Sequence, residues 1–177
     1  EEFGKLMTTE MGKPLAQGIA EAEKCAWVCD YYAENAEKHL SDIEIKTEMR
    51  KSYVTFQPIG TVLAIMPWNF PFWQVFRFSA PALMAGNAGV LKHSRNTMGC
   101  GESIEQIFIE AGFPEGLFTN LVIGSEPVES IINSPLISAV TLTGSTPVGA
   151  MVASIAGKAI KKTVMELGGS DPYVILE

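Results

Sequence analysis

The feature that most constrains the fold is a regular alternation of β-rich runs and helical stretches from residue 61 onwards. Five runs rich in Val, Leu, Ile and Thr are candidate strands: residues 61–66, 88–92, 118–123, 139–143 and 163–167. The stretches between them, residues 72–85, 97–111, 126–133 and 147–159, have helical character. Parallel strands joined by helices make right-handed crossovers. The pattern therefore predicts an α/β fold with a doubly wound, mostly parallel five-stranded sheet that is preceded by helices.

The N-terminal part carries helical spacing without such an alternation. Pro14 suits a first helical position, and the residues from Leu15 to Leu40 predict one long helix. Its expected apolar face consists of Leu15, Ile19, Ala22, Ala26, Cys29, Ala33, Ala36 and Leu40. The run 51–57 has strand character and is followed by the breakers Pro58 and Gly60, which predicts a bridging hairpin segment. We divide the chain into N-terminal helices (1–43), a bridging strand segment (44–58) and an incomplete α/β domain (59–177).

Composition and charge narrow the functions that are possible. Apolar residues make up 47% of the chain, which is enough for a sizeable core, and the net charge of −7 argues against a nucleic-acid surface. Three cysteines suit a reducing compartment better than a disulfide framework, and Cys25 and Cys29 have no partners that would make a metal site. No signal peptide or membrane-spanning run is recognisable. We expect a cytoplasmic protein, and both ends of the sequence suggest a fragment of a longer one.

Distinctive polar and glycine-containing segments follow all five predicted strands. They are Pro67-Trp68-Asn69-Phe70-Pro71, Lys92-His93-Ser94-Arg95, Gly124-Ser125, Gly144-Ser145-Thr146-Pro147-Val148-Gly149 and Glu166-Leu167-Gly168-Gly169. Open α/β sheets bind ligands outside the carboxyl ends of their strands, so we expect these segments to converge on one site. The segment GSTPVG can bring backbone amides close to a phosphate, but it lacks the GxGxxG spacing and can also be a simple strand-to-helix turn.

Three residues in these segments have side chains that suit specific chemistry. Asn69 lies in a proline-flanked turn that can hold its amide as a donor to an oxyanion, although turn asparagines are common for structural reasons. Glu166 follows an apolar run, where a partly desolvated carboxylate can act as a general base or pair with a neighbouring lysine. Lys92 can bind ribose hydroxyls or phosphate, or it can be a solvated strand end.

Five ordered motifs together resemble the aldehyde dehydrogenase superfamily. They are EMGKP (10–14), PWNFP (67–71), LKHS (91–94), GSTPVG (144–149) and ELGGSDP (166–172). The run GTVLAIMPWNFPFWQVFR (60–77) and the ELGGSDP ending are most similar to the bacterial NAD(P)-dependent succinate-semialdehyde dehydrogenases of that superfamily. The resemblance implies a Rossmann-like cofactor domain, NAD or NADP as cofactor, and oxidation of an aldehyde, with succinic semialdehyde as the expected substrate, to the carboxylic acid.

The resemblance also assigns roles to individual residues. It makes Asn69 the group that stabilises the oxyanion and Glu166 the general base that activates water. The implied cofactor contacts are Met66, Pro67, Trp68, Lys92, Ser94, Arg95, Gly124, Gly144, Ser145, Val148, Leu167 and Gly168. An arginine at position 95, where NAD-preferring relatives often have a glutamate, can accept a 2′-phosphate, or it can face solvent. Arg77 corresponds to an arginine that holds the distal carboxylate of a semialdehyde, unless it is a surface residue of its helix.

The sequence departs from the family pattern in one respect, and two other functions remain open. The nucleophilic cysteine of the family is expected beyond Glu166 and outside this sequence, so we expect the chain alone to be inactive, and the full-length protein to be a homodimer or homotetramer. One rival is an acylating or acyl-phosphate-reducing dehydrogenase, which Glu166 argues against because those reactions need no hydrolytic base. The other rival is a non-catalytic nucleotide-binding or assembly module.

Overall fold

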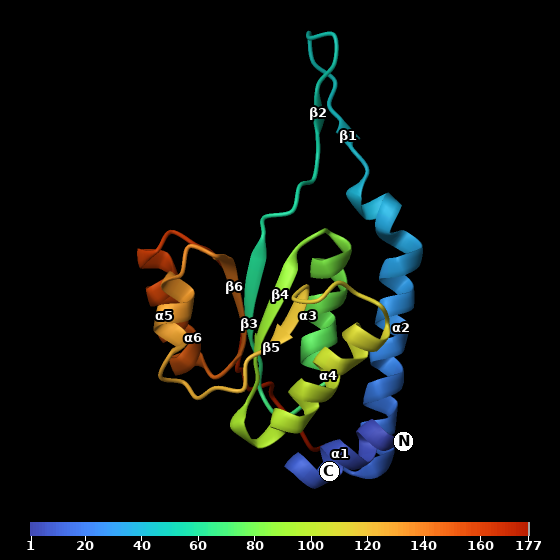
Figure 1. Cartoon of the computed structure of the whole chain (residues 1–177), viewed down its shortest axis with the longest axis vertical. Helices are drawn as coiled ribbons and strands as arrows, with labels where there is room; N and C mark the ends of the chain where they lie inside the picture. Colours follow the sequence, from blue (N-terminus) through green and yellow to red (C-terminus); the bar gives the residue numbers. More distant parts are fainter. Residues whose placement is uncertain (177) are drawn as a thin grey trace.

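The computed structural model describes residues 1–176, and its helices and strands alternate as the sequence predicts (Figure 1). The helices are α1 (Glu2–Met11), α2 (Leu15–Leu40), α3 (Trp73–Met84), α4 (Met98–Glu110), α5 (Val128–Asn133) and α6 (Thr146–Lys158), with a 3₁₀ turn at Arg95–Thr97. The strands are β1 (Ile43–Glu44), β2 (Tyr53–Val54), β3 (Thr61–Ile65), β4 (Ala88–Lys92), β5 (Phe118–Asn120), β6 (Ile137–Gly144) and β7 (Lys162–Leu167). The expected α/β fold class is confirmed.

The main sheet has five parallel strands in the order β5-β4-β3-β6-β7. The chain runs outwards from β3 to β4 and β5, and then returns to the other side of β3 to form β6 and β7. Leu63, at the centre of β3, pairs with Val90 of β4 and Val140 of β6. The reversal of strand order between β3 and β6 makes a topological switch point, which is where open α/β sheets bind their ligands.

Helices cover both faces of this sheet, and each face has its own apolar core. Alternate β3 residues point to opposite faces, so Leu63 packs with α5 and α6 whereas Ala64 packs with α1 to α4. Figure 1 shows α5 and α6 on one side and α2, α3 and α4 on the other. The carboxyl ends of the strands are held at fixed positions between these two layers.

The two N-terminal helices are part of the second layer. Gly18 of α2 lies so close to α1 that a Cβ atom there would be 2.9 Å from the Cα of Gly4. The buried residues of α2 are Gly18, Glu21, Cys25 and Val28. The apolar face predicted from the sequence is therefore partly wrong, since Leu15, Ala26 and Ala33 are exposed. Apolar spacing gave no reason to place the carboxylate of Glu21 inside the protein.

Two glutamates from the N-terminal helices cap helices of the sheet layer. The Glu21 carboxylate accepts hydrogen bonds from the backbone N–H groups of Phe72 and Trp73 at the start of α3, both at 2.9 Å. Glu10 accepts from Gly99 and Cys100 at the start of α4, at 2.7 and 2.9 Å. These contacts satisfy amides that have no partner within their own helices. The side chain of Thr97, the residue before α4, makes no capping hydrogen bond to this helix.

A two-stranded antiparallel hairpin separates the N-terminal helices from the sheet. Ile43 pairs with Val54 and Glu44 with Tyr53, and the hairpin extends away from the body of the protein (Figure 1). The sequence predicted strand character at residues 51–57, and the strand itself is limited to Tyr53–Val54. Its side chains are exposed on both strands, because neither strand lies against the core.

Two local sequence signals do not mark helix boundaries in this structure. A proline inside a helix usually kinks or ends it, but α3 continues past Pro81 to Met84, and the N–H of Ala85 donates to the Pro81 carbonyl at 3.0 Å. Serine is a common helix cap, but α5 begins at Val128, so Ser125 does not cap it. Within residues 1–176, no helix is long and apolar enough to cross a membrane.

Candidate cofactor and aldehyde site

A pocket of about 500 Å³ lies at the switch point between β3 and β6. It is formed by the segment after β3, by the ends of β6 and β7 and by one face of α3. Its lining residues are Pro67, Trp68, Asn69, Gln74, Arg77, Thr143, Gly144, Ser145, Glu166, Leu167 and Gly168. The structure therefore brings together nine residues that the sequence predicted as catalytic, substrate-binding or cofactor-binding, from three separate segments and α3.

Arg77 and Glu166 contact each other in this pocket. Arg77 Nη2 lies 3.6 Å from Glu166 Oε2 and donates to Thr143 Oγ1 at 3.4 Å. Their side chains are 39% and 53% exposed, so both groups remain accessible to a small ligand. Glu166 is thus paired with a cation, as one alternative from the sequence expected, but the cation is an arginine rather than a lysine.

An adjoining pocket of about 490 Å³ is mainly apolar. It lies between α3 and the strands β3, β6 and β7, and its walls include Phe78, Pro81 and Val164. The two pockets share Gln74, Arg77, Thr143 and Glu166. The ion pair of Arg77 and Glu166 therefore lies where the polar and the apolar cavity meet.

The N-terminus of α6 forms part of the polar pocket. Gly144 and Ser145 line the pocket, and the side chain of Ser145 does not cap the helix. First-turn amides such as those of Thr146 and Val148 have no acceptor within a helix, so this end can bind an anion such as a pyrophosphate. The side chain of Val148 is 42% exposed and does not line the pocket. These features fit the pyrophosphate part of a dinucleotide.

A second group of predicted cofactor residues lies at the carboxyl ends of β4 and β5. Lys92 is half-buried, and burial is the main cause that lowers its pKa from the ordinary lysine value, followed by the nearby positive charge of Arg95. Ser94 donates a hydrogen bond to Asn96 Oδ1 at 2.6 Å. Arg95 forms an exposed ion pair with Glu126 at 3.1 Å, next to Gly124. This group is separate from the residues that line the polar pocket.

Met66 differs from the other predicted cofactor contacts, because its side chain belongs to the core. It is 4% exposed and packs in the apolar cluster beneath α3, and it also borders the apolar pocket. Its backbone N–H donates to the carbonyl of Lys92 at 3.1 Å, which joins the ends of β3 and β4. The side chain of Met66 therefore belongs to the core next to the site and does not line the polar pocket.

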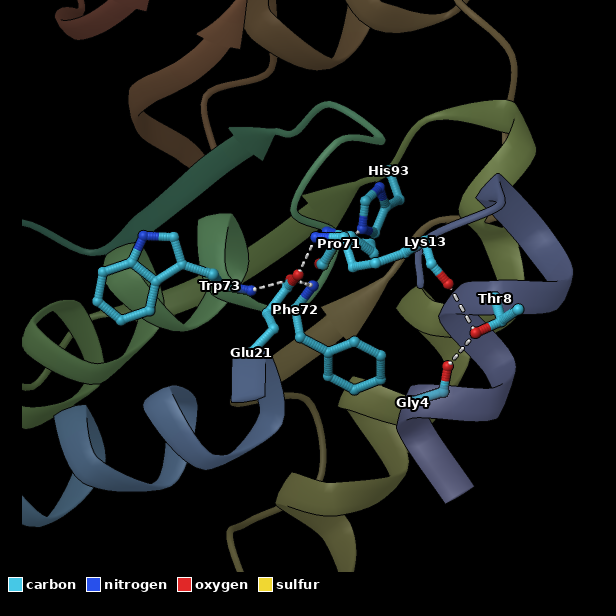
Figure 2. A network of polar contacts seen from close by, with 8 residues as sticks. All are labelled: Gly4, Thr8, Lys13, Glu21, Pro71, Phe72, Trp73 and His93. Carbon is cyan, nitrogen blue, oxygen red and sulfur yellow. Dashed lines mark hydrogen bonds and ion pairs between the residues drawn. The ribbon is translucent and has the colours of Figure 1, made fainter. Parts of the chain in front are cut away.

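A buried polar network holds the segment that carries Asn69 (Figure 2). Glu21 caps α3 directly after this segment and forms a buried ion pair with Lys13. On the other side, the backbone N–H of Ser94 donates to His93 Nδ1 at 2.8 Å, so the ring proton is on Nε2, which donates to the Pro71 carbonyl at 2.9 Å. The residues that directly follow Asn69 and Phe70, Pro71 to Trp73, are therefore tied to both α2 and the end of β4.

The whole sequence, residues 1–177, matches the aldehyde dehydrogenase family. The chain belongs to this family. It is 55% identical over 177 residues to a probable succinate-semialdehyde dehydrogenase (NADP+) of Synechocystis sp., covering 100% of this chain and 39% of the relative. It is 50% identical over 179 residues to a succinate-semialdehyde dehydrogenase (NADP+) of Mycobacterium avium, covering 99% of this chain and 38% of the relative.

Solved structures of the aldehyde dehydrogenase family show the same fold. The succinic semialdehyde dehydrogenase of Streptococcus pyogenes in complex with NADP+ superposes with a TM-score of 0.96 at 39% identity. The match covers 99% of this chain and 39% of that structure. The chain therefore spans about two fifths of the length of the relatives that it matches.

Several residues of the candidate site were not predicted from the sequence. Gln74 and Thr143 line both pockets, and Gln74 lies one helical turn before Arg77 on the same face of α3. Lys13 and His93 belong to two of the matching motifs, EMGKP and LKHS, but were given no role. Among residues 1–176, no three His, Cys, Asp or Glu side chains come together in a way that could hold a metal ion.

Burial of His93 predicts a specific pH dependence of stability. His93 is fully buried, and burial lowers its pKa below the ordinary value of 6.5. The unfolded chain therefore takes up this proton more readily than the folded protein. The stability that neutral His93 contributes should be fully present above pH ~6.5 and should decrease as the pH falls towards the folded pKa.

The thermal midpoint measured between pH 7.5 and 5.5 checks this expectation. The decrease below pH ~6.5 should be smaller in His93→Gln than in the unsubstituted protein, because glutamine cannot titrate. His39→Gln is the matched control, since His39 is exposed and should leave the pH profile unchanged. Parallel profiles for His93→Gln and the unsubstituted protein would show that His93 is not the responsible group.

Proposed function

We propose that this chain provides the cofactor-binding part of an NADP-accepting dehydrogenase that oxidises succinic semialdehyde to the carboxylic acid. The observation that carries the proposal is the polar pocket, where Asn69, Arg77 and Glu166 meet beside the open N-terminus of α6. The names of the relatives from Synechocystis sp. and Mycobacterium avium support the choice of substrate and cofactor. Because the chain covers 39% and 38% of these relatives, the proposal concerns the full-length protein.

Three side chains of the pocket divide the chemistry between them. Asn69 donates a hydrogen bond to the oxygen of the aldehyde as negative charge develops there. Arg77 binds the distal carboxylate of the substrate through its guanidinium group. Glu166 accepts a proton from the water that releases the acid. The nicotinamide cofactor, when bound, supplies the acceptor for the hydride.

None of the three cysteines of this chain is suited to act as the nucleophile that attacks the aldehyde. Cys25 and Cys100 are buried, and burial raises the pKa of both thiols well above the ordinary value. Burial and the neighbouring Asp30 also raise the pKa of Cys29. A reactive cysteine needs a lowered pKa and access to the substrate, so none of the three suits this role.

The cofactor would extend across the carboxyl edge of the sheet. The first turn of α6 would bind its pyrophosphate, and Lys92 and Ser94 would bind the adenine-side ribose. Pro67, Trp68, Leu167 and Gly168 would surround the nicotinamide end, next to Asn69. Arg95, which follows β4, would bind the 2′-phosphate of NADP+, because its side chain is 68% exposed and ends in a guanidinium group.

The first test is the formation of reduced cofactor by the full-length protein with succinic semialdehyde, measured separately with NAD+ and NADP+. Turnover with free succinate as the product would support the proposal, and the ratio of the two rates would test the role of Arg95. Activity only on simple aldehydes would agree with the family assignment but would contradict succinic semialdehyde as the substrate. No turnover with any aldehyde would contradict the proposed function.

Replacement of Arg77 should separate charged from uncharged substrates. We expect Arg77→Met to raise the KM for succinic semialdehyde by about 10- to 100-fold, which corresponds to the loss of a charge-assisted hydrogen bond. The kcat/KM for butanal, which has the same chain length and no carboxylate, should change by less than about threefold. Equal losses for the two aldehydes would show that Arg77 acts through Glu166 rather than through the substrate.

A further inference from the structure

The carboxyl ends of β4 and β5 present two opposite charges in direct contact. Arg95 Nη2 lies 3.1 Å from Glu126 Oε1, although the two residues are 31 positions apart. Both side chains are largely exposed, at 68% and 74%. An ion pair with this exposure is weak, so a ligand with a stronger negative charge can replace the glutamate.

Gly124 allows this contact to form. A Cβ atom at this position would lie 2.1 Å from Glu126 Oε2 and 2.8 Å from Arg95 Nη2. A side chain there would displace both charged groups. The absence of a side chain at position 124 therefore leaves the space in which the arginine and the glutamate meet.

The two groups suit different forms of the same ligand. A guanidinium binds the 2′-phosphate of an NADP-type cofactor, whereas a carboxylate accepts hydrogen bonds from the ribose hydroxyls of an NAD-type cofactor and repels a phosphate. Glu126 is held in the ionised form, because its own backbone N–H and Arg95 lower its pKa. Lys92 is the other charged group near this pair.

We infer that Glu126 is a specificity-determining residue that opposes Arg95 and limits the preference of the protein for NADP+. This inference rests on the proposed function, because it assumes that the adenine-side ribose lies at the ends of β4 and β5. NADP+ has to displace Glu126 from the guanidinium before its 2′-phosphate can bind. NAD+ leaves the pair intact, and its ribose hydroxyls can donate to the carboxylate.

The test is the dissociation constant of NADP+ and of NAD+ for the full-length protein, measured by titration calorimetry. We expect Glu126→Gln to lower the Kd of NADP+ by about three- to tenfold, because a competing ion pair and a repulsive charge are both removed. The Kd of NAD+ should stay constant or rise. In an Arg95→Gln background, Glu126→Gln should lower the Kd of NADP+ by a clearly smaller factor, because the competing ion pair no longer exists and only the repulsion between the carboxylate and the phosphate is removed.

Glu129→Gln is the matched control, because Glu129 is an exposed glutamate of α5 that does not contact Arg95. It removes the same charge and should leave both constants within about twofold. An equal gain in affinity for NAD+ and NADP+ in Glu126→Gln would overturn the inference in favour of general electrostatics. An unchanged Kd of NADP+ would also overturn it. If the unsubstituted protein bound neither dinucleotide, the proposed function would fail and the inference with it.

Discussion

Asn69→Ala is expected to lower the kcat for succinic semialdehyde by about 10²- to 10³-fold in the full-length protein, which is the usual cost of removing one oxyanion donor. Asn69 lines the polar pocket, and the residues shortly after it are held by His93, which bonds Pro71, and by Glu21, which caps α3. A donor fixed in this way needs little reorganisation when charge develops on the aldehyde oxygen. The measurement is the steady-state rate of NADPH formation at saturating substrate.

The control for this substitution is the binding of the cofactor. The Kd of NADP+ should change by less than about threefold, because the loss concerns an interaction made only in the transition state. Asn133→Ala, at an exposed position on α5, is the matched variant and should keep the full rate. A kcat within about threefold of the unsubstituted value would remove Asn69 from the mechanism.

Glu21→Ala is expected to cause the largest loss of stability, about 3–5 kcal/mol, because it leaves one charge of a buried pair without its partner. The side chains of Lys13 and Glu21 are only 5% and 2% exposed. The substitution also removes the acceptor for two amides at the start of α3. The measurement is the urea midpoint of unfolding, compared with that of the unsubstituted protein.

Two further variants separate the charge from the cap. Glu23→Ala, at an exposed position on the same helix, should change stability by less than about 0.5 kcal/mol. The double variant Lys13→Met with Glu21→Gln should be more stable than Glu21→Ala, because it removes both charges and keeps an oxygen that can accept from α3. A double variant no more stable than Glu21→Ala would mean that the uncompensated charge of Lys13 is not the cause.

The sequence predicted the regular elements well where local signals agreed. The bounds of α2 and β4 match the predictions, since Pro14 precedes the helix and a short apolar run forms the strand. The fold class is confirmed for the same reason, because the alternation of strands and helices is a local pattern. The third predicted strand was too long, and β5 ends at Asn120. Periodicity alone does not show where pairing with a neighbouring strand stops.

The site could be predicted only in part. The convergence of the strand ends followed from parallel topology, and the polar pocket contains most of the predicted residues. The separate position of Lys92, Ser94 and Arg95, and the pairing of Arg95 with Glu126, depend on the order of the strands in space. The burial of Glu21 could not be predicted from local sequence either, because its partners at the start of α3 lie 51 and 52 positions further along the chain. The division into three parts, the cytoplasmic location and the oligomeric state stay predictions.

The two glutamate caps have a consequence for anyone who wishes to move this dinucleotide-binding unit into a chimeric enzyme. A graft that begins at the first strand of the main sheet would seem natural, because α1 and α2 precede the hairpin. It would leave the starts of α3 and α4 without Glu21 and Glu10. The smallest transplantable unit therefore includes both N-terminal helices. It also includes the hairpin, because the hairpin connects these helices to the sheet.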